Sequence, residues 1–126
     1  MGAVPSDGAK GTAPMHNIRL PHHRLEAYGV AIQMLDAVRR AGIRDAHLRD
    51  QAMRSAKSAC LNAAEGAGRV SRADKARSFT IARAEAGEAA AAVEIAVLAG
   101  DADAAGLEAV LGLANRFIAM MTRLIR

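Results

Sequence analysis

From about His22 to the end of the chain, apolar residues recur every three or four positions, and no segment alternates apolar and polar residues as a strand does. Four stripes of this kind can be traced. They comprise Leu25, Tyr28, Ile32, Leu35 and Val38; Leu48, Ala52, Ala56, Ala59 and Ala63; Phe79, Ala82, Ala86, Ala89, Val93 and Val97; and Leu107, Val110, Leu111, Ala114, Phe117, Ile118, Met121 and Leu124. The spacing predicts four amphipathic helices and an all-α fold.

Glycines mark the expected ends of the first three helices. Gly42 and Gly100 are each expected to close a helix as a left-handed residue. Gly66 and Gly68 are expected to stop the second helix and to let the turn after it adopt positive φ.

Short polar residues mark the expected helix starts. Asp45 is placed to cap the second helix, and Ser71, with Asp74 three residues later, to cap the third. Asp101 or Asp103 is expected to start the fourth. Connections of about three to six residues favour antiparallel neighbours, so the sequence predicts an up-down-up-down four-helix bundle.

The length of 126 residues suits one domain. Residues 1–21 contain all three prolines and no apolar period, which predicts a disordered N-terminal arm ahead of a bundle over residues 22–126. Either Met1 or Met15 could be the native start. Aromatic residues make up only 2 % of the chain, and alanine supplies much of its apolar content. A core this thin suggests that the subunit associates with copies of itself.

Cys60 is the single cysteine, which excludes an internal disulfide and suits a reducing cytoplasm. Its apolar helix neighbours favour a buried, unreactive thiol. There is no stretch of about 18 uncharged apolar residues to span a membrane and no secretory signal, so a cytoplasmic location is expected.

The chain carries a net charge of +4, and the charge is unevenly distributed. Residues 16–83 contain thirteen Lys or Arg against six Asp or Glu, whereas residues 84–126 contain three against six. A basic surface of this kind can contact nucleic-acid phosphates without selecting bases. The candidate contacts are Arg54, Lys57, Arg69, Arg72 and Lys75. The alternative is that these residues only form a solvated helical face.

The segment from Asn62 to Ser71 is the most distinctive stretch of the chain. A phosphate-binding loop would need a preceding strand, which is not predicted here, so Gly66 and Gly68 indicate a helix-to-helix turn. Asn62 and Glu65 share a helical face and are expected to hydrogen-bond to a neighbouring helix or to the turn. A catalytic role for this pair is a weaker alternative, because a lone carboxylate makes a poor active site. We predict no enzymatic activity, no cofactor and no metal site.

Several residues of this region follow a family motif, Q-x-R-R-A-A-x-S-x-x-x-N-I-A-E-G-x-G-R-x-S. The matching positions are Gln51, Arg54, Ala56, Ser58, Asn62, Ala64, Glu65, Gly66, Gly68, Arg69 and Ser71. Ile81, Ala82, Arg83 and Glu88 downstream, and Leu25, Tyr28 and Ala31 upstream, are also similar to the family. Met53 departs from the motif, since it replaces the first arginine. The chain thus resembles bacterial four-helix-bundle proteins first noted as products of intervening sequences in 23S ribosomal RNA genes.

The resemblance implies a homo-oligomer, typically a pentameric ring, with no established enzymatic activity. Distant relatives, the accessory variability determinants of diversity-generating retroelements, bind a reverse transcriptase and nucleic acid. Two hypotheses follow for this chain. One is an oligomeric bundle that binds RNA or DNA phosphates; the other is a protein–protein assembly or adaptor module that binds no nucleic acid.

Overall fold

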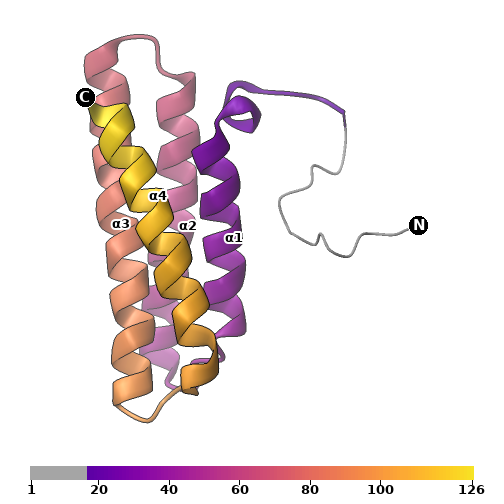
Figure 1. Cartoon of the computed structure of the whole chain (residues 1–126), viewed down its shortest axis with the longest axis vertical. Helices are drawn as coiled ribbons and strands as arrows, with labels where there is room; N and C mark the ends of the chain where they lie inside the picture. The colour runs from indigo at the N-terminus through magenta and orange to yellow at the C-terminus, as the bar shows by residue number, and fades with distance from the viewer. Residues whose placement is uncertain (1–16) are drawn as a thin grey trace.

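The computed structural model describes residues 17–126, and these residues form helices without any strand. A short 3-10 helix, η1 (Pro21–Arg24), precedes α1 (Glu26–Arg40), α2 (Ala46–Gly68) and α3 (Arg72–Leu98). A second 3-10 turn, η2 (Ala104–Gly106), leads directly into α4 (Leu107–Ile125). Consecutive helices run in opposite directions, and α4 returns to pack against α1 as well as α3 (Figure 1). The predicted all-α, up-down-up-down four-helix bundle is confirmed.

Small side chains dominate the core of the bundle. Ten alanines on α2 and α3 are buried: Ala52, Ala56, Ala59, Ala63, Ala82, Ala86, Ala89, Ala90, Ala92 and Ala96. The largest fully buried side chains are those of Phe117, Met34, Met121, Val93 and Val110. Because alanine buries little area, the helices must approach closely to exclude water.

The predicted stripes of α2, α3 and α4 face this core, and that of α1 does so only in part. On α4, two members of the predicted stripe, Leu111 and Leu124, are nevertheless 38 % and 41 % exposed. The predicted α1 stripe was displaced by part of a turn: the buried face is Ala27, Val30, Ala31, Met34 and Val38, and the other stripe residues are only half-buried. Ala31 allows α1 to approach α2 closely, since its carbonyl oxygen lies 3.3 Å from the Cys60 Sγ. The larger Ile32 and Leu35 pack at the edge of the core.

Most of the predicted helix ends are confirmed. Gly42 and Gly100 have φ of 67° and 83° and follow α1 and α3 as left-handed residues. The backbone N–H of Leu48 donates to the Asp45 carboxylate at 2.9 Å, and that of Asp74 donates to the Ser71 hydroxyl at 3.1 Å. Asp45 and Ser71 therefore cap α2 and α3.

The predicted start of the fourth helix was wrong. Asp103 precedes η2, and its carboxylate forms no capping hydrogen bond but lies 3.7 Å from the Arg44 guanidinium. The N-cap position of α4 is Gly106, which has no side chain to cap with. α4 therefore begins without a side-chain cap, because the last residues of η2 continue directly into α-helical geometry.

The prediction of positive φ at Gly66 and Gly68 was also wrong. Both glycines lie inside α2, and within residues 17–126 only Gly42 and Gly100 have positive φ. Gly66 is needed for packing instead: a Cβ atom there would lie 2.4 Å from the Phe79 ring of α3. A Cβ at Gly68 would meet nothing within 4 Å.

The chain around α4 is apolar enough to be compared with a membrane span. By length and composition, Ala104–Ile125 is the one described segment that could cross a membrane. In this structure Val110, Ala114, Phe117 and Met121 pack into the bundle core. Most of the predicted N-terminal arm, residues 1–16, lies outside the described residues, so its disorder remains a prediction.

Candidate nucleic-acid interface

The packing of α2 against α3 positions most of the candidate residues. Gln51 Nε2 donates to the Glu88 carboxylate at 2.6 Å and links the N-terminal part of α2 to α3. Nearer the α2–α3 turn, the Phe79 ring lies against the bare backbone at Gly66. These contacts set the rotation of α2 and leave the face opposite its alanine stripe exposed to solvent.

Arg54 and Lys57 lie on this outer face of α2. They line an open depression of about 540 Å³, whose other lining residues include Asp50, Leu61 and Asn62. Both cations are exposed, and within residues 17–126 neither forms a hydrogen bond or an ion pair. Their spacing of three residues makes them neighbours on the helix surface. Their donor groups are therefore available to an anionic ligand.

Lys75 has a different environment. Its Nζ donates to the carbonyl oxygens of Gly66 and Ala67, at 3.1 and 3.2 Å. These carbonyls belong to the last turn of α2, where the carbonyl oxygens lack the N–H donor that a continuing helix would supply. The Gly66 oxygen also accepts from the Arg69 N–H at 3.3 Å. A lysine at a helix C-terminus also interacts favourably with the helix dipole. The ammonium group of Lys75 therefore stabilises the end of α2.

The two arginines nearest the turn are also engaged. Arg69 forms an ion pair with Glu65, and this hydrogen bond raises the pKa of the Arg69 guanidinium. Arg72 donates from Nη2 to the main-chain oxygen of Arg126 at 2.7 Å, which ties the start of α3 to the end of α4. Both side chains remain exposed to solvent.

The five predicted contacts fall into two groups rather than one patch. Arg69, the C-cap residue of α2, follows Arg54 by fifteen residues, which corresponds to about 22 Å along the helix axis. Arg54 and Lys57 form a group on the side of the bundle, and Arg69, Arg72 and Lys75 form a group at the α2–α3 end. The spacing along the chain already suggests these two groups, although the prediction assigned all five residues to one basic face.

Sequence reasoning also missed the cations that α4 brings to the α2–α3 end. Arg123 lies in the last turn of α4, and Arg126 accepts the hydrogen bond from Arg72. Figure 1 shows the end of the chain beside the α2–α3 turn. The C-terminal part of the chain has a net negative charge, but two of its six acids, Asp101 and Asp103, are in the α3–α4 connection, at the opposite end of the bundle.

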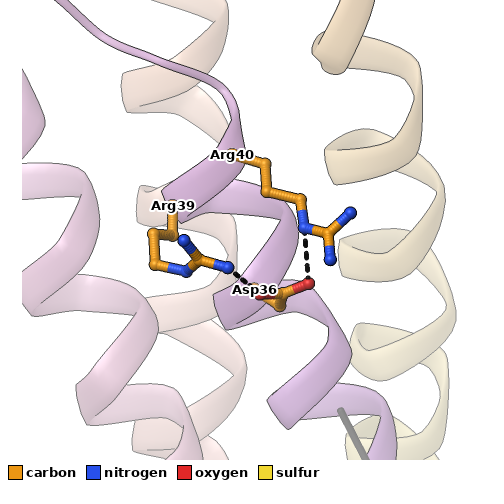
Figure 2. Close-up of polar contacts among 3 residues, drawn as sticks. All are labelled: Asp36, Arg39 and Arg40. Atoms are coloured by element: carbon orange, nitrogen blue, oxygen red, sulfur yellow. Dashed lines mark hydrogen bonds and ion pairs between the residues drawn. The ribbon is translucent and has the colours of Figure 1, made fainter. Parts of the chain in front are cut away.

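A further basic pair near the end of α1 shares one carboxylate as its partner. Figure 2 shows Arg39 and Arg40 on either side of Asp36. Arg39 Nη2 donates to the Asp36 carboxylate at 2.7 Å, and Arg40 Nε lies 2.9 Å from its other oxygen. This trio provides a comparison for Arg54 and Lys57, whose charges have no such partner.

Of the two alternatives predicted for Asn62 and Glu65, a neighbouring helix or the turn, the described contacts show only the second, and only for Glu65. Asn62 Nδ2 donates to the Ser58 carbonyl oxygen at 2.9 Å and to the Ser58 hydroxyl at 3.2 Å, both within α2. Glu65 pairs with Arg69, the C-cap residue of α2. Asn62 thus stiffens its own helix, and Glu65 secures the helix end.

The chemistry of the other candidate groups is limited by their surroundings. Cys60 is buried, and burial raises the pKa of its thiol from 9.0 to about 11. The thiol therefore stays protonated, as expected for a core residue. Among residues 17–126, no three His, Cys, Asp or Glu side chains are grouped closely enough to hold a metal ion.

Comparison with known proteins places the chain in a family. No curated protein matches the chain. The family described as 23S rRNA-intervening sequence protein matches residues 23–123, which include all four α-helices apart from the last residues of α4. The match covers most of the sequence and the bundle observed in the structure. The chain belongs to the 23S rRNA-intervening sequence protein family.

Proposed function

We propose that this protein is a non-enzymatic, homo-oligomeric helical bundle that binds the phosphates of RNA or DNA. The observation that carries the proposal is the exposed pair of Arg54 and Lys57 on the outer face of α2, without a protein partner among the described residues. Arg69, Arg72 and Lys75 add positive charge at the α2–α3 end, although contacts within the protein already engage their donor groups.

The position of the aromatic rings favours phosphate contacts over base contacts. Phe79 and Phe117 are 3 % and 0 % exposed, and Tyr28 is half-buried against His22. Stacking of unpaired bases needs exposed aromatic faces, which the described bundle does not present. Arginine and lysine can instead contact the phosphates of a structured duplex without reading its sequence.

Two further observations support a binding role without catalysis. Glu65, the carboxylate of the distinctive segment, is engaged by Arg69 at an exposed helix end. The pKa of the Cys60 thiol, about 11, keeps it from acting as a nucleophile near neutral pH. From the family resemblance, we also propose that the chain assembles into a pentameric ring and has a protein partner such as a reverse transcriptase. We propose a cytoplasmic location as well.

A titration of fluorescently labelled hairpin RNA tests the proposal. Because hydrogen bonds to charged groups contribute about 1.5–3 kcal/mol each, the double variant Arg54→Gln, Lys57→Gln is expected to bind at least about tenfold more weakly than the wild type. The matched control is Arg39→Gln, Arg40→Gln, which removes the same charge from residues already paired with Asp36. Equal losses in the two variants would contradict the proposed site. Oligomeric wild-type protein that binds no RNA would favour the adaptor hypothesis.

A further inference from the structure

One end of the bundle combines exposed aliphatic side chains with exposed arginines. At this end η1 leads into α1, α2 turns into α3, and α4 reaches its last turn (Figure 1). Val70 lies in the α2–α3 turn between Arg69 and Arg72 and is 95 % exposed. Turns are normally built from Gly, Pro, Asn, Asp or Ser, so a fully exposed valine here indicates a contact outside the bundle.

Two other segments bring the same combination of side chains to this end. Ile18 and Leu20, ahead of η1, are exposed on either side of Arg19. In the last turn of α4, Leu124 is exposed beside Arg123. Single exposed aliphatic residues are common on protein surfaces, but here three segments far apart in the sequence place them at one end of the fold. Their convergence marks an interaction surface.

The charge of this end is positive. Its exposed arginines are Arg19, Arg24, Arg69, Arg72, Arg123 and Arg126. The carboxylates of the same segments are Glu26, Glu65 and Asp74. Glu65 is paired with Arg69, and Glu26 lies 3.5 Å from Arg116. The excess of arginines over carboxylates attracts anions to this end of the bundle.

The arginines at the opposite end have carboxylate partners within the protein. Arg44, in the α1–α2 connection, lies 3.7 Å from Asp103 in the α3–α4 connection. Asp36 lies 2.7 Å from Arg39 and 2.9 Å from Arg40. The two ends of the bundle therefore differ in the charge that they present to a ligand.

An anionic lipid surface matches both properties of the α2–α3 end, whereas a nucleic acid matches only its charge. The phosphates of either ligand attract arginines, but a nucleic-acid backbone offers no apolar layer to an aliphatic side chain. At a bilayer, aliphatic side chains enter below the headgroups while neighbouring arginines stay at the level of the lipid phosphates. Three short segments also suit a fluid headgroup layer better than a protein partner, since a partner helix docks into one continuous groove.

From these observations we infer that this end of the bundle is a peripheral binding surface for anionic lipid membranes. The surface, defined as the basic end, consists of residues 18–20, 69–72 and 123–126. Its aliphatic side chains enter only the boundary between headgroups and acyl chains, so no helix has to cross the bilayer. The inference goes beyond the proposed phosphate binding by Arg54 and Lys57, which lie on the side of the bundle.

Co-sedimentation with lipid vesicles tests the basic end. The wild type is expected to sediment with vesicles of equal parts phosphatidylcholine and phosphatidylglycerol, and to stay in solution with phosphatidylcholine alone. Binding should weaken as salt screens the arginines. Val70→Ser leaves the charge unchanged and should lower the vesicle partition coefficient about tenfold, because one valine side chain is no longer transferred from water.

Leu98→Ser is the matched control, since Leu98 is 83 % exposed at the opposite end of the bundle, and it should bind vesicles as the wild type does. Circular dichroism establishes that each variant is folded. If Val70→Ser is not, the double variant Arg19→Gln, Arg24→Gln is used, with an expected loss of about tenfold or more. Failure of the wild type to bind the anionic vesicles, or equal binding to both kinds of vesicle, would overturn the inference. Equal partition coefficients for Val70→Ser and Leu98→Ser would do the same.

Arg54→Gln, Lys57→Gln separates the basic end from the proposed phosphate site. This double variant should bind vesicles within about twofold of the wild type, because charges farther apart than a Debye length are largely screened. A loss as large as that of Val70→Ser would place the lipid contact on the side of α2 and overturn the inference. Vesicle binding is measured without RNA, so each of the two proposals can fail independently of the other.

Discussion

At the scale of single residues, Gly66 matters for the structure, but for a reason other than the predicted one. A glycine near the end of a predicted helix normally indicates a left-handed turn, and Gly42 and Gly100 behave in this way. Gly66 is helical, and its missing side chain makes room for the Phe79 ring. The sequence alone could not reveal this cause, because Phe79 is brought to Gly66 only by the packing of α2 against α3.

Substitution of the two neighbouring glycines should therefore have opposite effects. Gly66→Ala is expected to lower the free energy of unfolding by about 1–3 kcal/mol, since the new methyl group would overlap the Phe79 ring. Gly68→Ala should leave that free energy unchanged or raise it by up to about 1 kcal/mol, because alanine favours helix and a Cβ there has open space. Urea unfolding measures both. Similar destabilisation by the two substitutions would contradict the packing role of Gly66.

Cys60 provides a residue-scale prediction about pH. Burial raises the pKa of its thiol from 9.0 to about 11 in the folded protein, so between these values the unfolded state binds fewer protons than the folded state. The free energy of unfolding should then fall as pH rises through this window, and the contribution is fully present below pH 9. Urea unfolding at pH 8 and pH 10.5 should show a larger decrease for the wild type than for Cys60→Ala. Equal decreases in the free energy of unfolding for the two proteins would show that burial does not raise the pKa of the Cys60 thiol.

At the scale of helices, local signals predicted the capping of α2 and α3, whereas the rotation of α1 required its neighbours. Asp45 and Ser71 cap their helices through contacts within three residues, which a sequence reveals directly. The buried face of α1 depends on the close approach at Ala31, and the start of α4 depends on η2. The role of Lys75 also depends on a neighbouring helix. Its charge suggested a phosphate contact, but its capping of α2 arises only when α3 folds back beside the turn.

Lys75→Met separates these two roles. The substitution keeps the aliphatic chain but removes the donor to the carbonyls of Gly66 and Ala67, so the free energy of unfolding should fall by about 1–3 kcal/mol. Arg77→Met removes the same charge from an exposed side chain and should change stability little. Thermal or urea unfolding gives both values. A neutral effect of Lys75→Met on stability, with a large loss of RNA affinity, would instead make Lys75 a phosphate contact.

At the scale of the whole molecule, the helical pattern was sufficient to predict the all-α bundle, but linear charge counts did not predict its electrostatic layout. Folding places Arg123 and Arg126 beside the α2–α3 turn, while Asp101 and Asp103 lie at the other end (Figure 1). The availability of each cation also depends on its neighbours in space. Asp36 forms ion pairs with both Arg39 and Arg40, whereas Arg54 and Lys57 project from the outer face of α2 without such a partner among the described residues.

The most direct test of phosphate binding by Arg54 and Lys57 is the salt dependence of RNA affinity. Each phosphate contact that is lost reduces the slope of log K against log salt concentration by about 0.7–0.9. Titrations from about 50 to 200 mM salt should therefore give a slope that is shallower by roughly 1.4–1.8 for Arg54→Gln, Lys57→Gln than for the wild type. The slope for Arg39→Gln, Arg40→Gln should match the wild type. Identical slopes for all three proteins, or wild-type affinity that does not change with salt, would contradict the account.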